Sequence, residues 1–289
     1  MFVFKAAVVG AGVMGGEIAQ VVAAADVPVL LKDVEEEFVD AGLTKAREVT
    51  ESQVGKLVSK GKLSEERGRE QIDHTLSLIT GTTEYEGFGE VDFAIEAVPE
   101  KMEVKHGVFA ELDAWTPGHA VLASNTSGLS ITEIADVTNR PDKVVGFHFF
   151  WPASVMRLIE IVEGEDTSQD TLRVAGNFAQ AIRKTPIRCA ECPGFVVNRI
   201  LASAASELWR YQDESGVDPA ELDEHVKQAA SLPMGPFRVA DMSGLDTAVK
   251  VARDMRDAYG DRFYVHKGME QRVADGDLGA KTGKGFYEH

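Results

Sequence analysis

The chain has 289 residues, 44% apolar and 27% charged, which is the balance of an ordinary globular protein with room for one large or two medium domains. No apolar run approaches the length of a membrane helix, and the first ten residues lack the basic leader of a secretion signal. A formal net charge of −17 argues against nucleic acids and anionic membranes as partners, so an anionic ligand would need local basic residues and helix N-termini.

The N-terminal residues follow the pattern of a dinucleotide-binding unit. An apolar strand is expected over residues 2–9, a helix over 14–25 and a second strand over 27–31. A G-x-G-x-x-G loop joins the first strand to the helix. Its glycines allow a tight turn, a close approach of a pyrophosphate and close helix–sheet packing. A glycine turn in an unrelated βα unit is the less favoured interpretation. The loop residues expected to bind the cofactor are Gly10, Gly12, Val13, Met14 and Gly15.

Asp33 follows the second expected strand, 21 positions after Gly12. A carboxylate at this spacing accepts hydrogen bonds from the hydroxyls of an adenosine ribose. It would repel a 2′-phosphate, and the next three residues offer no arginine to receive one. The sequence therefore predicts NAD, not NADP, as the cofactor.

Residues 36–60 have the spacing of a long helix with one apolar stripe. Its basic residues are usually part of a solvated face, but in so acidic a chain they are also candidates for phosphate contacts. They are Lys45, Arg47, Lys56, Lys60 and, just beyond the helix, Lys62. Ser64 begins a shorter helix, and a strand is expected over residues 76–80.

Two further strands are expected over residues 91–98 and 120–124, with a helix over 101–114 between them. Glu96 and Glu100 flank the carboxyl end of the first strand, where ligands bind in open α/β sheets. Ser127 follows the second strand and is a candidate donor to a substrate oxygen, although such small hydroxyl residues also simply form turns. Ser130 begins a capping box that predicts a short helix.

Two short apolar runs, residues 144–150 and 156–162, each carry one ionisable residue, His148 and Glu160. Strands joined by so short a connection usually lie side by side, so the imidazole and the carboxylate are expected to meet. A carboxylate that accepts the proton of one ring nitrogen fixes the tautomer and raises the basicity of the other. This pairing predicts a general base; the alternative is a histidine that merely satisfies the core.

A helix is expected from Thr167 or Ser168 to Arg183 and a last strand over residues 186–189, after which the pattern is helical. The expected fold class is therefore α/β: a Rossmann-type domain over residues 1–190, followed by an all-α domain over 191–289. Helices are expected up to Gly216, from Asp218, and over 244–259, with a rigid loop over 231–237.

Cys189 and Cys192 form a single Cys-x-x-Cys without further ligands at zinc spacing or a thioredoxin-like context. We interpret both as packing residues in a reducing compartment, so the expected location is cytoplasmic and no metal is expected.

Over its whole length the chain resembles the 3-hydroxyacyl-CoA dehydrogenases. The stretches that carry the resemblance are GAGVMG at 10–15, IEAVPE at 95–100, SNTSGLSITEIA at 124–135, GFHFF at 146–150, MRLIEIV at 156–162, PGFVVNR at 193–199, LPMGPF at 232–237 and KTGKGFY at 281–287. The resemblance implies reversible NAD-dependent oxidation of an (S)-3-hydroxyacyl-CoA to the 3-oxoacyl-CoA, as in fatty-acid β-oxidation. It also implies a helical domain that closes the active site, and a homodimer.

The resemblance also implies roles for individual residues. His148 would be the catalytic base and Glu160 its partner, with Ser127 and Asn198 as polar contacts to the substrate oxygen. The cofactor site would be lined by Asp33, Glu100, Lys105, Ser127 and Lys281, and Lys56 would meet the phosphates of CoA.

The clearest departure from the family is Trp151, which stands where the family usually has an Asn that touches the nicotinamide end of the cofactor. An indole accepts no hydrogen bond and is much larger. Trp151 is therefore expected to contact the substrate or nicotinamide and to reshape the pocket. Two alternatives stay open from the sequence: an NAD-dependent dehydrogenase of a free hydroxy acid, and a non-enzymatic dinucleotide-binding protein.

Overall fold

The computed structural model describes residues 2–289, and the chain divides into two compact units, one ending at Phe195 and one running from Val196 to His289. The sequence analysis places this boundary near residue 190.

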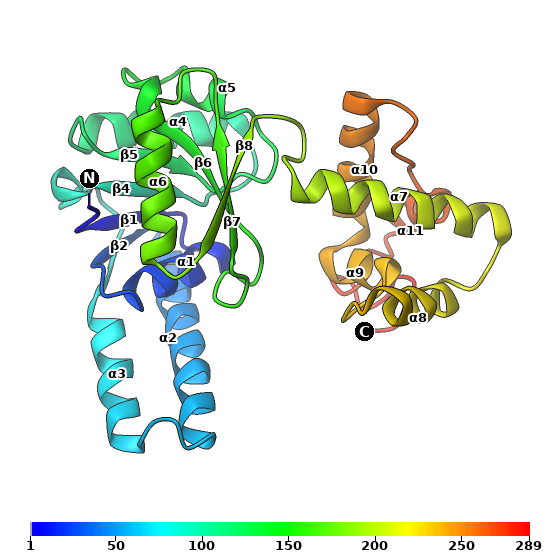
Figure 1. Ribbon diagram of the computed structural model, residues 1–289, viewed down its shortest axis with the longest axis horizontal. Coiled ribbons are helices and arrows are strands. Elements are labelled where there is room, and N and C mark those ends of the chain that lie inside the picture. The colour runs from blue at the N-terminus through cyan, green and yellow to red at the C-terminus, as the bar shows by residue number, and fades with distance from the viewer. Residues whose placement is uncertain (1) are drawn as a thin grey trace. The chain divides into compact units, whose positions relative to one another are not determined.

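The first unit is built on one eight-stranded sheet with the order β3-β2-β1-β4-β5-β6-β7-β8 (Figure 1). Neighbours from β3 to β6 are parallel, β7 is antiparallel to β6, and β8 is parallel to β7. The strands are β1 (Ala6–Val9), β2 (Val29–Lys32), β3 (Ile79–Thr82), β4 (Phe93–Glu96), β5 (Val121–Ser124), β6 (Val144–Phe149), β7 (Leu158–Glu163) and β8 (Thr185–Ala190). This mixed, mostly parallel sheet with its flanking helices confirms the predicted Rossmann-type class.

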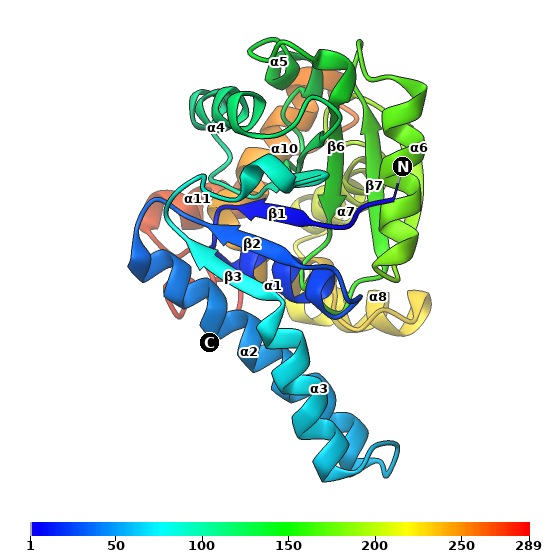
Figure 2. The same cartoon turned by 90° about the vertical axis from the view of Figure 1, so that its left-hand side faces the viewer.

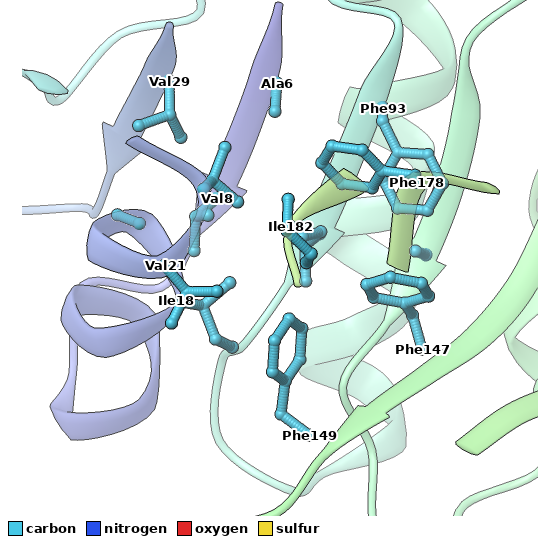
Figure 3. Close-up of a cluster of buried hydrophobic side chains, with 14 of the residues drawn as sticks. Ala6, Val8, Ile18, Val21, Val29, Phe93, Phe147, Phe149, Phe178 and Ile182 are labelled. Atoms are coloured by element: carbon cyan, nitrogen blue, oxygen red, sulfur yellow. The ribbon is translucent and has the colours of Figure 1, made fainter. Parts of the chain in front are cut away.

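Helices cover both faces of the sheet. They are α1 (Val13–Ala23), α2 (Glu36–Ser59), α3 (Glu65–Ser77), α4 (Met102–Trp115), α5 (Ile131–Ala135) and α6 (Gln169–Ala181). On one face α1 and α6 bury an apolar cluster that includes Ile18, Phe147 and Phe178 (Figure 3). On the other face α4 and α5 bury a second cluster around Phe109 and Ile134. The pair α2–α3 extends away from the sheet (Figure 2).

Predicted helix caps are present. The hydroxyls of Ser64, Ser130 and Ser168 accept the N–H groups of Arg67, Glu133 and Thr171, at the starts of α3, α5 and α6. These bonds satisfy backbone donors that the first turn of a helix leaves open.

Two strand predictions were wrong by three residues or more at one end. The strand expected over residues 2–9 begins only at Ala6, and Phe2 and Phe4 are exposed. Ala6 pairs with Val29 and Phe93, the first residues of β2 and β4, so no neighbouring strand extends far enough to pair with the residues before it. The strand expected over 76–80 begins at Ile79, because Leu76 belongs to α3.

The second unit consists of five helices: α7 (Val197–Ser215), α8 (Pro219–Ala230), α9 (Pro236–Ser243), α10 (Leu245–Tyr259) and α11 (Lys267–Asp275). Their shared core includes Trp209, Phe237 and Leu245. The loop expected over residues 231–237 already contains the start of α9, and α11 was not predicted. No helix within residues 2–289 combines the length and the apolarity needed to cross a bilayer.

Candidate active site

The glycine loop lies at the carboxyl end of the central strand β1. Gly10 has a φ of +101°, and a Cβ there would lie 2.6 Å from the carbonyl of Ala97. A Cβ on Gly15 would collide with the carbonyl oxygen of Gly10. A Cβ on Gly12, in contrast, would meet nothing within 4 Å. Gly10 thus lets the loop approach the backbone that follows β4, Gly15 lets the helix close onto the loop, and Gly12 leaves the outer side of the loop open to a ligand.

Helix α1 begins at this open side. Its N-cap, Gly12, has no side chain to cap the helix, and Val13 is exposed. Free N–H groups and the positive end of the helix dipole make such a terminus suited to a phosphate. The geometry therefore fits the pyrophosphate of a dinucleotide.

Asp33 lies beside the loop, immediately after β2. Its Oδ2 accepts the N–H of Ala11 at 2.6 Å and its Oδ1 accepts the N–H of Val34 at 2.7 Å. These bonds fix the carboxylate next to the phosphate-binding turn, and each oxygen keeps acceptor capacity for a ribose hydroxyl.

We expect Asp33 to set the cofactor preference. Asp33→Asn keeps the size of the side chain and removes the charge that would repel a 2′-phosphate. The ratio of kcat/KM with NADH to that with NADPH should fall by about tenfold or more, since a like charge at close range is worth at least ~1.4 kcal/mol. Glu35→Gln is the matched control, because Glu35 is exposed and its side chain caps nothing. Equal use of both cofactors by the unaltered protein would overturn the assignment.

A buried charge network supports the next part of the site. The ammonium of Lys105 lies 2.7 Å from Glu96 Oε1 and 3.2 Å from Glu100 Oε2. Lys105 and Glu96 are 1% and 0% exposed, whereas 44% of the Glu100 side chain is exposed. Lys105 therefore lies beneath the surface and holds Glu100, which alone of the three reaches the solvent.

The network orders the loop that carries Ser127. Glu96 Oε2 accepts the hydroxyl of Ser124 at 2.6 Å. Glu100 Oε1 accepts the hydroxyl of Thr126 at 2.6 Å and the N–H of Ser127 at 2.9 Å. Ser127 is therefore exposed just beyond the carboxyl end of β5, with its backbone held by this anchored turn.

His148 and Glu160 meet as the sequence analysis expected. They are direct partners in the antiparallel register of β6 and β7, and His148 Nδ1 lies 2.8 Å from Glu160 Oε2. Only 5% of the imidazole and none of the carboxylate is exposed. A carboxylate accepts but does not donate, so Nδ1 carries the proton and Nε2 is left to exchange one. The rings of Phe150 and Phe195 flank the imidazole at centroid distances of 4.6 and 5.7 Å.

The other expected site residues lie in different places. Trp151 is 61% exposed, in the turn that follows β6. Lys56 is exposed in the last turn of α2. Asn198 and Lys281 belong to the second unit. Asn198 is the second residue of α7, and Lys281 lies 2.8 Å from Asp246 Oδ1. The cofactor or substrate contacts assigned to these residues stay predictions.

Sequence reasoning missed Asn125, Glu17 and Lys184. Asn125 Oδ1 accepts the N–H of Phe149 at 2.9 Å and so ties the end of β6 to that of β5. Glu17 and Lys184 hold the turn after β6 by hydrogen bonds. An acidic residue within the apolar pattern of residues 14–25 was the signal available for Glu17.

The cysteines behave as packing residues. Burial, and then the charge of Glu160, raise the pKa of Cys189 to about 12. Both thiols are free.

Comparison with known proteins adds a family to this geometry. Residues 5–192 match the model of the 3-hydroxyacyl-CoA dehydrogenase NAD-binding domain, and residues 194–289 match that of the C-terminal domain of the same family. A probable 3-hydroxybutyryl-CoA dehydrogenase of Deinococcus radiodurans is 36% identical, with 99% of this chain and 100% of the relative covered. The crystal structure of (S)-3-hydroxybutyryl-CoA dehydrogenase from Ralstonia eutropha has a TM-score of 0.91 at 34% identity and 99% coverage of both chains.

Longer proteins also match. The fatty acid oxidation complex subunit alpha of a Psychrobacter species is 39% identical over 99% of this chain, which spans 38% of the length of that relative. The chain therefore corresponds to the whole of some relatives and to one segment of others.

Proposed function

The chain belongs to the 3-hydroxyacyl-CoA dehydrogenase family, and we propose that it reversibly oxidises (S)-3-hydroxyacyl-CoA to 3-oxoacyl-CoA with NAD. The observation that carries this proposal is the buried His148–Glu160 pair on neighbouring strands of the sheet that also bears the glycine loop. A buried imidazole oriented by a carboxylate is an arrangement suited to general-base catalysis.

In the proposed reaction His148 moves the proton. Nε2 takes the proton of the 3-hydroxyl group during oxidation and returns it during reduction, while Glu160 stabilises the imidazolium that forms. Ser127 would donate a hydrogen bond to the same oxygen. The dinucleotide would be held by Gly12, Asp33 and the N-terminus of α1. When bound, its nicotinamide would be the hydride acceptor.

An assay with and without CoA tests the substrate class. We expect NADH oxidation with acetoacetyl-CoA and a kcat/KM at least about a hundredfold lower with free acetoacetate, because the binding energy of a remote CoA moiety also contributes to catalysis. Equal rates would support the alternative of a free hydroxy-acid dehydrogenase. NADH binding without turnover of any 3-oxoacyl thioester would support a non-enzymatic protein.

We further infer that the protein is a cytoplasmic homodimer. Apolar residues exposed on the second unit support an assembly surface there, among them Ile200 and Leu201 at 62% and 61% exposure. The two free cysteines are consistent with a reducing compartment. Light scattering of the purified protein tests the dimer, which a monomeric mass would contradict.

A further inference from the structure

Residues 150–157 connect β6 to β7 and begin two positions after His148. Three of their side chains are apolar and strongly exposed: Trp151 at 61%, Val155 at 68% and Met156 at 41%. Exposed apolar side chains this close in sequence are candidates for contact with a ligand or a partner. Because Phe150 already packs on the imidazole of His148, this turn is suited to form an apolar wall beside the base.

Polar side chains from other segments of the unit form hydrogen bonds with this turn. Glu17 Oε2 accepts both the N–H and the hydroxyl of Ser154, each at 3.0 Å. Lys184 Nζ donates to the carbonyl oxygens of Ala153 at 2.5 Å and Met156 at 2.8 Å. Gln53 Nε2, from α2, donates to the carbonyl oxygen of Ser154 at 3.2 Å. Three residues of the turn are thus fixed by side chains from three other parts of the unit.

Both charged groups are buried. Glu17 is 5% exposed and Lys184 9%. Burial lowers the pKa of Lys184, and the nearby charge of Glu17 acts in the opposite direction. Burying a carboxylate and an ammonium costs stability that an apolar pair of the same volume would not cost. Both groups use their polar atoms in hydrogen bonds to the turn.

Glu17 also has a particular place in the chain. It lies in the second turn of α1. The first turn of this helix follows directly on the glycine loop at Gly12. The bond from Glu17 to Ser154 spans 137 residues and joins the cofactor helix to the turn beside the base. Helix α1 therefore contacts both the glycine loop and the 150–157 turn that follows His148.

We propose that Glu17 is a positioning residue that, through Ser154, holds the apolar side chains of the 150–157 turn against the reacting acyl group. The proposal rests on the proposed function for its substrate. The contact between Glu17 and Ser154, which we call the brace, is a structural property that can be measured without turnover.

The kinetic test uses Glu17→Gln and Ser154→Ala in the full-length protein. The first change keeps the volume and an acceptor oxygen but removes the charge, and the second removes only the hydroxyl bond. A misplacement of about 1 Å can cost on the order of 100-fold in rate. We therefore expect kcat/KM for acetoacetyl-CoA to fall about 10- to 100-fold in Glu17→Gln and less in Ser154→Ala, with NADH affinity changed less than about twofold. The double variant should be hardly worse than Glu17→Gln, because both changes weaken the same contact between Glu17 and Ser154.

Asp113→Asn is the matched control. Asp113, whose side chain is also largely buried, accepts the N–H of Asn139 at 2.9 Å and that of Arg140 Nε at 2.8 Å. It lies near the end of α4, away from the carboxyl ends of the strands. This change should lower the melting temperature and leave kcat/KM unchanged.

The second readout is the mobility of Trp151. The chain has three tryptophans, so Trp115→Phe and Trp209→Phe together leave Trp151 as the only indole. In that background Glu17→Gln should increase the fast component of its fluorescence anisotropy decay, and Asp113→Asn should not. If the unaltered protein did not turn over acetoacetyl-CoA, the proposed function would fail while this readout still tested the brace. The proposal is overturned if Glu17→Gln lowers only the melting temperature, with kcat/KM and the anisotropy decay unchanged.

Discussion

His148→Gln is expected to lower kcat by about 10²–10⁴-fold, the contribution typical of a positioned general base, and to leave NADH binding almost unchanged. Glutamine cannot take a proton from the substrate hydroxyl. Glu160→Gln keeps the shape of its side chain but removes the charge that supports the imidazolium. It should lower kcat as well, because the imidazolium that forms during oxidation loses the carboxylate that stabilises it.

If the two residues act as a unit, the double variant should be hardly slower than His148→Gln alone. His119→Gln is the control, since His119 also pairs with a carboxylate, Asp92, at 3.1 Å but is 55% exposed. The measurement is kcat against pH for each variant, with the melting temperature alongside. Strictly multiplicative losses would contradict the coupling of the two residues. A folded Glu160→Gln enzyme with full kcat would mean that Glu160 only satisfies a buried position.

This pair was predictable because its geometry is local. Two strands joined by a short connection pair antiparallel, and the two ionisable residues stood out from their apolar neighbours. The glycine loop was predictable for the same reason, since its strand, turn and helix are consecutive in sequence. Asp33 needed only the additional expectation that β2 lies beside β1.

The errors arose where a neighbouring element, and not the local sequence, determines the residue at which a strand or helix begins or ends. Phe2 and Phe4 have strand-like character, but a strand extends only as far as its partners β2 and β4 do. Leu76 continues the apolar run of β3 in sequence but lies in the last turn of α3 in the structure. Pro236 stands at the first position of α9, where proline is well tolerated, so a Gly-Pro pair that suggests a loop in fact begins a helix.

Within the site, burial was the property that the sequence could not supply. The resemblance places Lys105 along the cofactor site, which stays a prediction, and the structure adds that its ammonium is enclosed by Glu96 and Glu100. Glu17 is isolated in sequence from Ser154, and no local pattern links an acidic residue in the first helix to a turn so far along the chain. Such contacts follow from the sheet order, which tertiary packing sets.

The enclosed lysine leads to the largest expected effect on stability. Lys105→Met keeps the length of the side chain but leaves the buried carboxylate of Glu96 without a cation. Removing one partner of a buried ion pair typically costs about 3–5 kcal/mol, because the other charge stays desolvated. We therefore expect a loss of this size in the free energy of unfolding, measured by urea denaturation. Turnover should also fall, since Glu96 and Glu100 hold the loop of Ser127.

Two further variants separate the buried charge from simple loss of contacts. Lys5→Met breaks the Lys5–Glu90 ion pair, which has a 2.9 Å separation but a 79% exposed carboxylate, and should cost only about 0–1 kcal/mol. Lys105→Met combined with Glu96→Gln removes both charges and should recover much of the lost stability, because a neutral amide still accepts the Val98 N–H. If Lys105→Met were as mild as Lys5→Met, or if the second change restored nothing, the network would not stabilise the site through its charges.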